Sequence, residues 1–217
     1  MPGAAPLCYN PTMRLALLRG AFVVGAVFGL AACSGARSND SSPYGTGDPN
    51  LAAANPAGGP IDPFLTDGSA VLKALDAIEQ RAGKPLRVTS MNADQTNGLS
   101  VDVQEPQNHV NVDQYVIAPD GTLTGPKPVK VMSLNGGPIT AAAVDSQAFD
   151  PRSIGFSRLA LTAHEAIVKS GFPDARVTTW ELDGLDPDDR RYIYLEAARG
   201  RPVAVVRPNL QIIQMRF

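Results

Sequence analysis

Residues 71–90, VLKALDAIEQRAGKPLRVTS, contain a helical pattern, a stop signal and the start of a strand. Apolar residues recur at intervals of three and four: Val71, Leu75, Ile78 and Ala82. This spacing puts them on one face of a helix. Gly83 stands where a helix C-cap belongs and Pro85 follows, so the helix should end there. The segment therefore predicts an amphipathic helix that leads directly into a strand.

A second segment, residues 159–179, LALTAHEAIVKSGFPDARVTT, repeats this order. Its apolar helical face consists of Leu159, Ala163, Ala166 and Ile167. Gly171 and Pro173 then supply the same stop signal, and residues 176–179 correspond to residues 87–90 with one extra residue in the loop. Self-similarity of this kind predicts two copies of one structural unit.

Segments with period-two alternation or turn residues follow each helix. In the first half they are residues 99–103 and 109–117 and a strand from Leu123; in the second they are residues 192–197, 202–206 and 211–217. The predicted fold class is α+β, a tandem repeat of a helix followed by a three- to four-stranded antiparallel meander. The first repeat should cover residues 64–130 and the second residues 157–217. Residues 131–156 connect them, and within this connector residues 139–144 fit either a short strand or a helical turn.

The repeated arrangement resembles PepSY-like domains and the architecture of the beta-lactamase inhibitor protein, over roughly residues 64–217. Both occur as exported chains with tandem units of this shape. The resemblance lies in the order of elements and includes no binding residues. It implies an exported binding or inhibitory module, although a fold does not by itself specify a function.

The N-terminal segment has the pattern of a secretory signal. Arg14 and Arg19 precede residues 20–34, which carry no charge. A positive region followed by an apolar one, shorter than the roughly 20 residues that span a bilayer, favours a cleaved signal peptide. We expect it to occupy residues 1–32. Since residues 1–12 lack this pattern, translation is predicted to start at Met13.

The signal ends in Leu30-Ala31-Ala32-Cys33, which resembles the lipobox of bacterial lipoproteins. The resemblance implies that Cys33 is lipidated, with palmitate-like acyl chains that hold the protein on a bilayer. Cys8 would be lost with the signal, so the mature domain would contain neither a free thiol nor a disulfide. A plain signal peptide with a chance cysteine is the alternative.

Residues 33–63 are rich in Ser, Gly, Asn, Pro and Ala, so the lipidated cysteine should be followed by a disordered linker. Loss of Arg14 and Arg19 with the signal changes the formal charge from −2 to −4, because the signal holds no acid. A mildly acidic chain is not expected to bind nucleic acid. Ser34 after the cysteine suggests the outer membrane, facing the periplasm, in a Gram-negative cell, and otherwise the outer face of the plasma membrane.

The two histidines do not form a recognisable catalytic or metal motif. His164-Glu165 would need a second histidine at position 168 to bind zinc as peptidase helices do, and that position is Val168. His164 is therefore predicted to lie on a helix surface, and His109 to open a strand. A Ser-His-Asp site assembled in space stays open, although the nucleophile-elbow pattern is missing. No cofactor and no metal are expected.

Two polar segments permit both a functional and a structural interpretation. Residues 183–189, DGLDPDD, offer the carboxylates that calcium binds, but the acids lack EF-hand spacing, and a solvated turn is favoured. Gly136-Gly137 does not follow a strand and open a helix, so no phosphate site is predicted.

Aromatic and basic residues gather in the second half of the chain. Tyr192 and Tyr194 fall on one face of a strand, with Arg199 and Arg201 just beyond it. Tyrosine and arginine are enriched in protein interfaces, so these four form the predicted interaction face. The alternative is ordinary sheet packing, and Trp180 is expected in the core. The predicted function is a membrane-anchored, non-catalytic domain that binds a protein or peptide; the alternatives are an envelope hydrolase and a structural lipoprotein of envelope assembly.

Overall fold

The structure is a computed structural model that describes residues 62–131, 138–184 and 191–217. The predicted signal peptide, Met13, Cys33 and nearly all of the predicted linker lie outside the described residues. So do Gly136-Gly137 and residues 185–189 of the acidic segment. Within the described residues, no helix has the length and apolar character needed to cross a bilayer.

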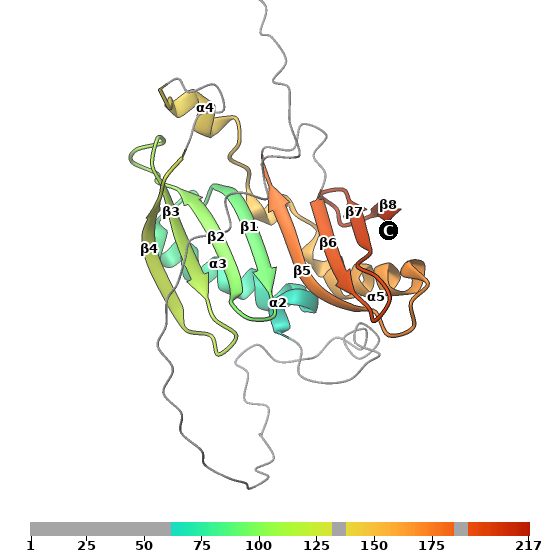
Figure 1. The fold of residues 1–217 in the computed structure, drawn as a ribbon. Coiled ribbons are helices and arrows are strands. Elements are labelled where there is room, and N and C mark those ends of the chain that lie inside the picture. The colour runs from blue at the N-terminus through green and yellow to red at the C-terminus, as the bar shows by residue number, and fades with distance from the viewer. Residues whose placement is uncertain (1–61, 132–137, 185–190) are drawn as a thin grey trace, which may run out of the picture. The chain divides into compact units, whose positions relative to one another are not determined.

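Eight strands form one antiparallel sheet in the order β4-β3-β2-β1-β5-β6-β7-β8 (Figure 1). The first four are β1 (Val88–Asp94), β2 (Gly98–Gln104), β3 (Val112–Ile117) and β4 (Leu123–Val129). The second four are β5 (Arg176–Asp183), β6 (Arg191–Glu196), β7 (Val203–Val206) and β8 (Ile212–Arg216). All pairs are antiparallel, and β1 and β5 join the two halves. The predicted α+β, antiparallel class is confirmed.

Three helices cover one face of this sheet: α2 (Pro63–Thr66), α3 (Gly68–Ala82) and α5 (Leu159–Ser170). The chain also has two short 3₁₀ turns, η2 (Pro151–Ser153) and η3 (Phe156–Arg158), and a short helix, α4 (Ala141–Asp145), that lies beyond the ends of the strands (Figure 1). In chain order α3 precedes β1–β4 and α5 precedes β5–β8. In Figure 1, α3 and α5 lie behind the sheet, so the opposite face is free of described helices.

Both helix ends lie where the glycines predict them. Gly83 caps α3 with φ 100°, and Gly171 caps α5 in the left-handed region with φ 72°. Side chains other than glycine rarely adopt such angles, so these residues end the helices at defined points. At the other end of α3, the Asp67 carboxylate accepts hydrogen bonds from the Ser69 and Ala70 backbone N–H groups.

The core lies between the helices and the inner face of the sheet. Trp180 is its largest fully buried side chain, as predicted, and only 1 % of its surface is exposed. Its indole N–H donates a hydrogen bond of 2.7 Å to the Phe64 carbonyl oxygen, and its ring lies 5.9 Å from that of Phe156. Because Phe64 belongs to α2, Trp180 links this short helix to β5.

Two details of the first half and the connector refine the sequence interpretation. The prediction that His109 opens a strand is wrong, because residues 105–111 form turns. The Asn111 N–H donates to the Asn108 carbonyl at 2.9 Å, and β3 begins only at Val112.

The connector residues 139–144 were expected to form either a short strand or a helical turn, and in the structure they contribute to the helix α4. Thr140 caps α4 by accepting a hydrogen bond from the Ala143 N–H.

Asp62 is a buried carboxyl group that caps α2. Its Oδ1 accepts a 2.8 Å hydrogen bond from the Phe64 N–H, whereas its Oδ2 has no hydrogen-bond partner among the described residues. Burial, with a smaller contribution from the charge of Asp94, raises the pKa of Asp62 to about 6, although the hydrogen bond from Phe64 lowers it. The carboxylate form is therefore disfavoured in the folded protein.

We expect Asp62→Asn to stabilise the protein at neutral pH. Folding raises the pKa of Asp62 from near 4 in the unfolded chain to about 6. The resulting contribution to the free energy of unfolding is complete below pH 4 and is lost as the pH rises through about 6. Asn keeps the capping oxygen without the charge, so its advantage over wild type should be near zero at pH 4 and about 2 kcal/mol at pH 8. Urea unfolding at several pH values measures it. Asp62→Ala, the control, loses the charge and also the cap, so it should be about 1 kcal/mol less stable than Asp62→Asn at all these pH values. A pH-independent effect of Asp62→Asn would contradict the explanation.

Candidate interaction surface

The sheet face opposite the helices carries both predicted tyrosines. Side chains alternate along β6: Arg191, Ile193 and Leu195 are buried, whereas Tyr192 and Tyr194 are half-buried. Across the strands, Tyr192 lies opposite Glu181 of β5 and Val205 of β7. Directly opposed residues in a sheet share a face, so the pairing brings these side chains together.

Tyr192 and Tyr194 form a small cluster with two charged residues. Their ring centroids are 6.4 Å apart, and the Arg216 guanidinium lies 5.7 Å from the centroid of the Tyr192 ring. The Tyr194 hydroxyl donates a 3.0 Å hydrogen bond to the Glu181 carboxylate. We call these four residues the tyrosine cluster. It presents aromatic surface with one charge of each sign, a combination that favours contact with another protein.

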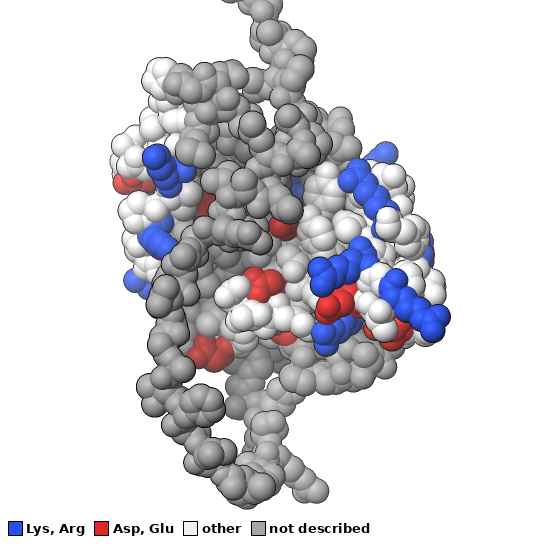
Figure 2. Space-filling view, in the orientation of Figure 1, with Lys and Arg blue, Asp and Glu red and all other residues white. Residues whose placement is uncertain are grey.

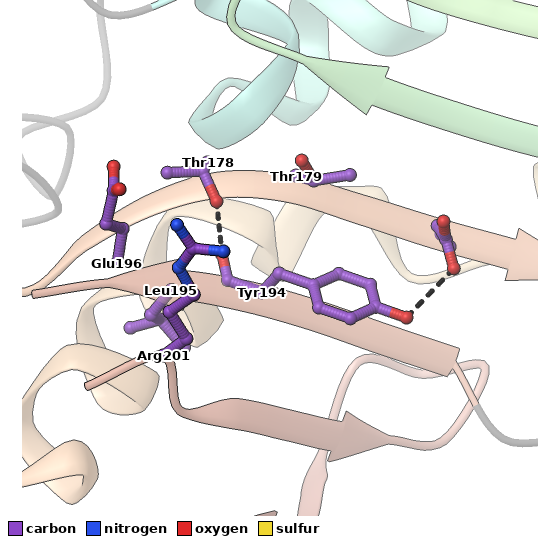
Figure 3. Close-up of a pocket in the computed structure, with 7 residues that line it drawn as sticks. Thr178, Thr179, Tyr194, Leu195, Glu196 and Arg201 are labelled. Carbon is purple, nitrogen blue, oxygen red and sulfur yellow. Dashed lines mark hydrogen bonds between the residues drawn. The ribbon is translucent and has the colours of Figure 1, made fainter. Parts of the chain in front are cut away.

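A pocket of about 370 Å³ lies beside the cluster between β5 and β6 (Figure 3). The residues that line it are Thr178, Thr179, Glu181, Tyr194, Leu195, Glu196 and Arg201. Glu196 is paired with Arg176 at 3.0 Å, and Glu181 accepts from Tyr194, so both carboxylates are engaged. The Arg201 guanidinium has no ion-pair partner among the described residues, which leaves a cation available to a bound acidic group.

Acidic residues occupy the centre of the same face. Asp102 of β2 and Asp183 of β5 both pair with Ser90 of β1, from opposite sides. Burial raises the pKa of Asp102, the hydrogen bond from Gln114 lowers it, and the charge of Asp183 raises it. Figure 2 shows cationic side chains on both flanks of this face, with acidic ones between them and also among the cations of the right-hand flank. The described part of the face therefore carries charges of both signs.

Three of the four residues predicted as the interaction face converge. Tyr192, Tyr194 and Arg201 lie within the cluster and pocket, whereas Arg199 is exposed in the turn between β6 and β7. The sequence interpretation missed Glu181 because it comes from β5, and only the pairing of Glu181 with Tyr192 could have indicated it.

His109 is part of a polar link to the connector. Its Nδ1 lies 2.8 Å from the Asp145 Oδ1, and Gln104 Nε2 donates to the same oxygen at 2.7 Å. These hydrogen bonds, that from Gln104 first, lower the pKa of Asp145. Because a carboxylate only accepts, we assign the proton to Nδ1. Within the described residues, no hydrogen bond joins the His109 ring to a serine hydroxyl.

His164 lies half-buried on α5, which agrees with a place at the helix surface. Val168, one turn later, is 64 % exposed. In the part of the chain that the structure describes, no group of three or more His, Cys, Asp or Glu residues is placed to hold a metal ion.

Comparison with known protein families gives no match, and a search of curated proteins gives none either. One solved structure is similar, a "putative lipoprotein" from Clostridium difficile 630. It is 13% identical, with a TM-score of 0.52 over 70% of this chain and 93% of that chain. At this identity the similarity concerns the fold. The chain thus shares the fold of this bacterial protein, and no family is assigned.

Proposed function

We propose that the protein is an exported lipoprotein attached to a bilayer through Cys33. The signal pattern of residues 14–32 and the lipobox-like residues 30–33 support this proposal. The similarity to a structure described as a lipoprotein agrees with it. The described domain would then work at the cell envelope, at the end of the linker that follows Cys33.

Cys33→Ala is expected to abolish lipid attachment, because no other thiol would remain in the mature chain. Labelling of cells with a palmitate analogue, followed by membrane fractionation, should show loss of the label and of membrane-retained mature protein. Cys8→Ala is the matched control and should behave as wild type. Equal labelling of the Cys33→Ala variant would disprove the proposed anchor.

The domain itself, in this proposal, consists of two copies of a helix-and-meander unit that together form a protein- or peptide-binding sheet. The order α3, β1–β4, α5, β5–β8 supports the two-copy interpretation. The observation that carries the binding proposal is the tyrosine cluster, which lies on the sheet face that no described helix covers. Half-buried aromatic rings beside an arginine are the residue types that dominate binding energy in many interfaces.

A photo-crosslinking aromatic residue at position 192 tests this proposal in intact cells. We expect a light-dependent adduct with one partner protein, since the side chain replaced lies at the centre of the proposed surface. Tyr194→Ala in the same chain should reduce adduct yield about tenfold, the effect of losing an aromatic contact worth about 1.4 kcal/mol. The control position is Val168, which is more exposed but lies on the outer face of α5. Equal adducts at both positions, or none at 192, would contradict the proposal.

The hydrolase alternative has one observation in its favour, the contact between His109 and Asp145. A triad would also need a nucleophile at the other ring nitrogen. His109→Ala should therefore leave adduct formation at position 192 unchanged, whereas an envelope hydrolase would lose its activity. A structural role in envelope assembly would be indicated if position 192 crosslinked mainly to a second copy.

A further inference from the structure

The two edges of the sheet differ in their ability to pair with another strand. At one edge, β4 contains Pro126 and Pro128 with the exposed Lys127 between them. Proline has no backbone N–H, and prolines and lysines are common means of blocking edge strands. The β4 edge is thus protected against continuation of the sheet.

At the other edge, β8 contains neither proline nor glycine. It pairs with β7 on one side, and among the described strands none covers its other side. Two large apolar residues stand exposed at this edge: Ile213 at 47 % and Phe217 at 83 %. Exposed backbone groups together with apolar side chains make this edge suitable for pairing.

The order of apolar and polar residues along this edge is the same when read from either end. Residues 213–217, IQMRF, alternate apolar and polar side chains about the central Met215. In an antiparallel pair of two such segments centred on Met215, Ile213 lies opposite Phe217 of the second copy. Gln214 then lies opposite Arg216 of the second copy, so that no like charges are directly opposed. Both exposed apolar residues become covered, and such cross-strand pairs stabilise strand pairing.

We propose that β8 pairs antiparallel with β8 of a second copy of this chain, in the register that places Gln214 opposite Arg216. Such a contact is isologous and closes after two copies. Growth beyond the dimer would require an open edge at β4, and its prolines block that edge. The two sheets join into one, while the tyrosine cluster stays on its open face.

Substitution of Gln214 tests the register by charge. This residue is exposed, so neither variant should affect folding. Gln214→Glu places an acid opposite Arg216 in each of two equivalent pairs, and Gln214→Lys places a cation there. We expect the dimerisation constant of the detergent-purified full chain, measured by analytical ultracentrifugation, to be about tenfold weaker for Gln214→Lys and several-fold stronger for Gln214→Glu.

Disulfide trapping gives a second, independent measurement. Differently tagged copies with Gln214→Cys and with Arg216→Cys are mixed and oxidised with copper–phenanthroline. We expect a mixed disulfide dimer, because directly opposed strand residues have Cα atoms about 4.5 to 5.5 Å apart, within disulfide reach. The parent chain and Lys127→Cys on the protected edge are the controls.

Three outcomes would overturn the proposal. The first is a monomer at all concentrations together with no mixed disulfide. The second is equal trapping at Lys127→Cys, which would indicate random collision. The third is trapping of Gln214→Cys, in membranes, only to a different protein, because this edge would then pair with a strand of that protein instead.

Discussion

Trp180→Ala is expected to destabilise the fold by about 4 kcal/mol, within the range for large-to-small changes in a core. The substitution empties the space beside the Phe156 ring and removes the indole hydrogen bond to the Phe64 carbonyl. Since Phe64 belongs to α2, this helix should lose its attachment to β5. Urea unfolding followed by far-ultraviolet circular dichroism measures the change, because the variant contains no tryptophan.

Trp180→Phe separates the two contributions. It keeps an aromatic ring against Phe156 but cannot donate to Phe64, and a loss of about 1 to 2 kcal/mol is expected. A loss below 1 kcal/mol for Trp180→Ala would mean that the described packing around β5 is wrong.

Gly68→Ala should destabilise the fold by about 3 kcal/mol through overlap with backbone. A Cβ at position 68 would lie 1.8 Å from the Phe156 carbonyl oxygen and 2.5 Å from its carbon. A backbone carbonyl cannot rotate away as a side chain can, so η3 or the start of α3 must move. Thermal unfolding detects the loss as a lower melting temperature.

Gly171→Ala is the matched control for this change. Its Cβ would meet nothing within 4 Å, so the only cost is the positive φ of 72°. We expect about 1 kcal/mol. Equal losses at the two glycines would contradict the overlap with Phe156, because helix propensity alone favours alanine at position 68.

The helices and strands that could be predicted are those with a pattern in their own sequence. Helical spacing and capping glycines indicated α3 and α5, because a helix is stabilised within its own segment. Alternation indicated most strands, because the two faces of a half-buried strand alternate along its own sequence. His109 was placed in a strand wrongly because alternation continues through residues 109–111, while hydrogen bonds of Glu105, Asn108 and Asn111 form turns there. The α2 helix was missed, since its four residues form no period and are held by Trp180 and the Asp62 cap.

Contacts between residues far apart in the sequence could not be predicted from the sequence patterns. The strand face of Tyr192 and Tyr194 followed from alternation, but the position of Glu181 beside them depends on the register between β5 and β6. That register is shifted by a bulge between Val177 and Thr179, which a period-two pattern cannot reveal. The contact between His109 and Asp145 spans 36 residues and depends on the path of the connector.

The pairing of β1 with β5 affects how the chain can reach this fold. Ser90 pairs with Asp102 in its own half but also with Asp183, so the middle of the sheet has high contact order and should form slowly. During synthesis from the N-terminus, β1–β4 can assemble while the β1 edge still lacks its neighbour. A chain that stops before residue 176 keeps this edge open as a template for aggregation. Completion of the second half therefore protects the first.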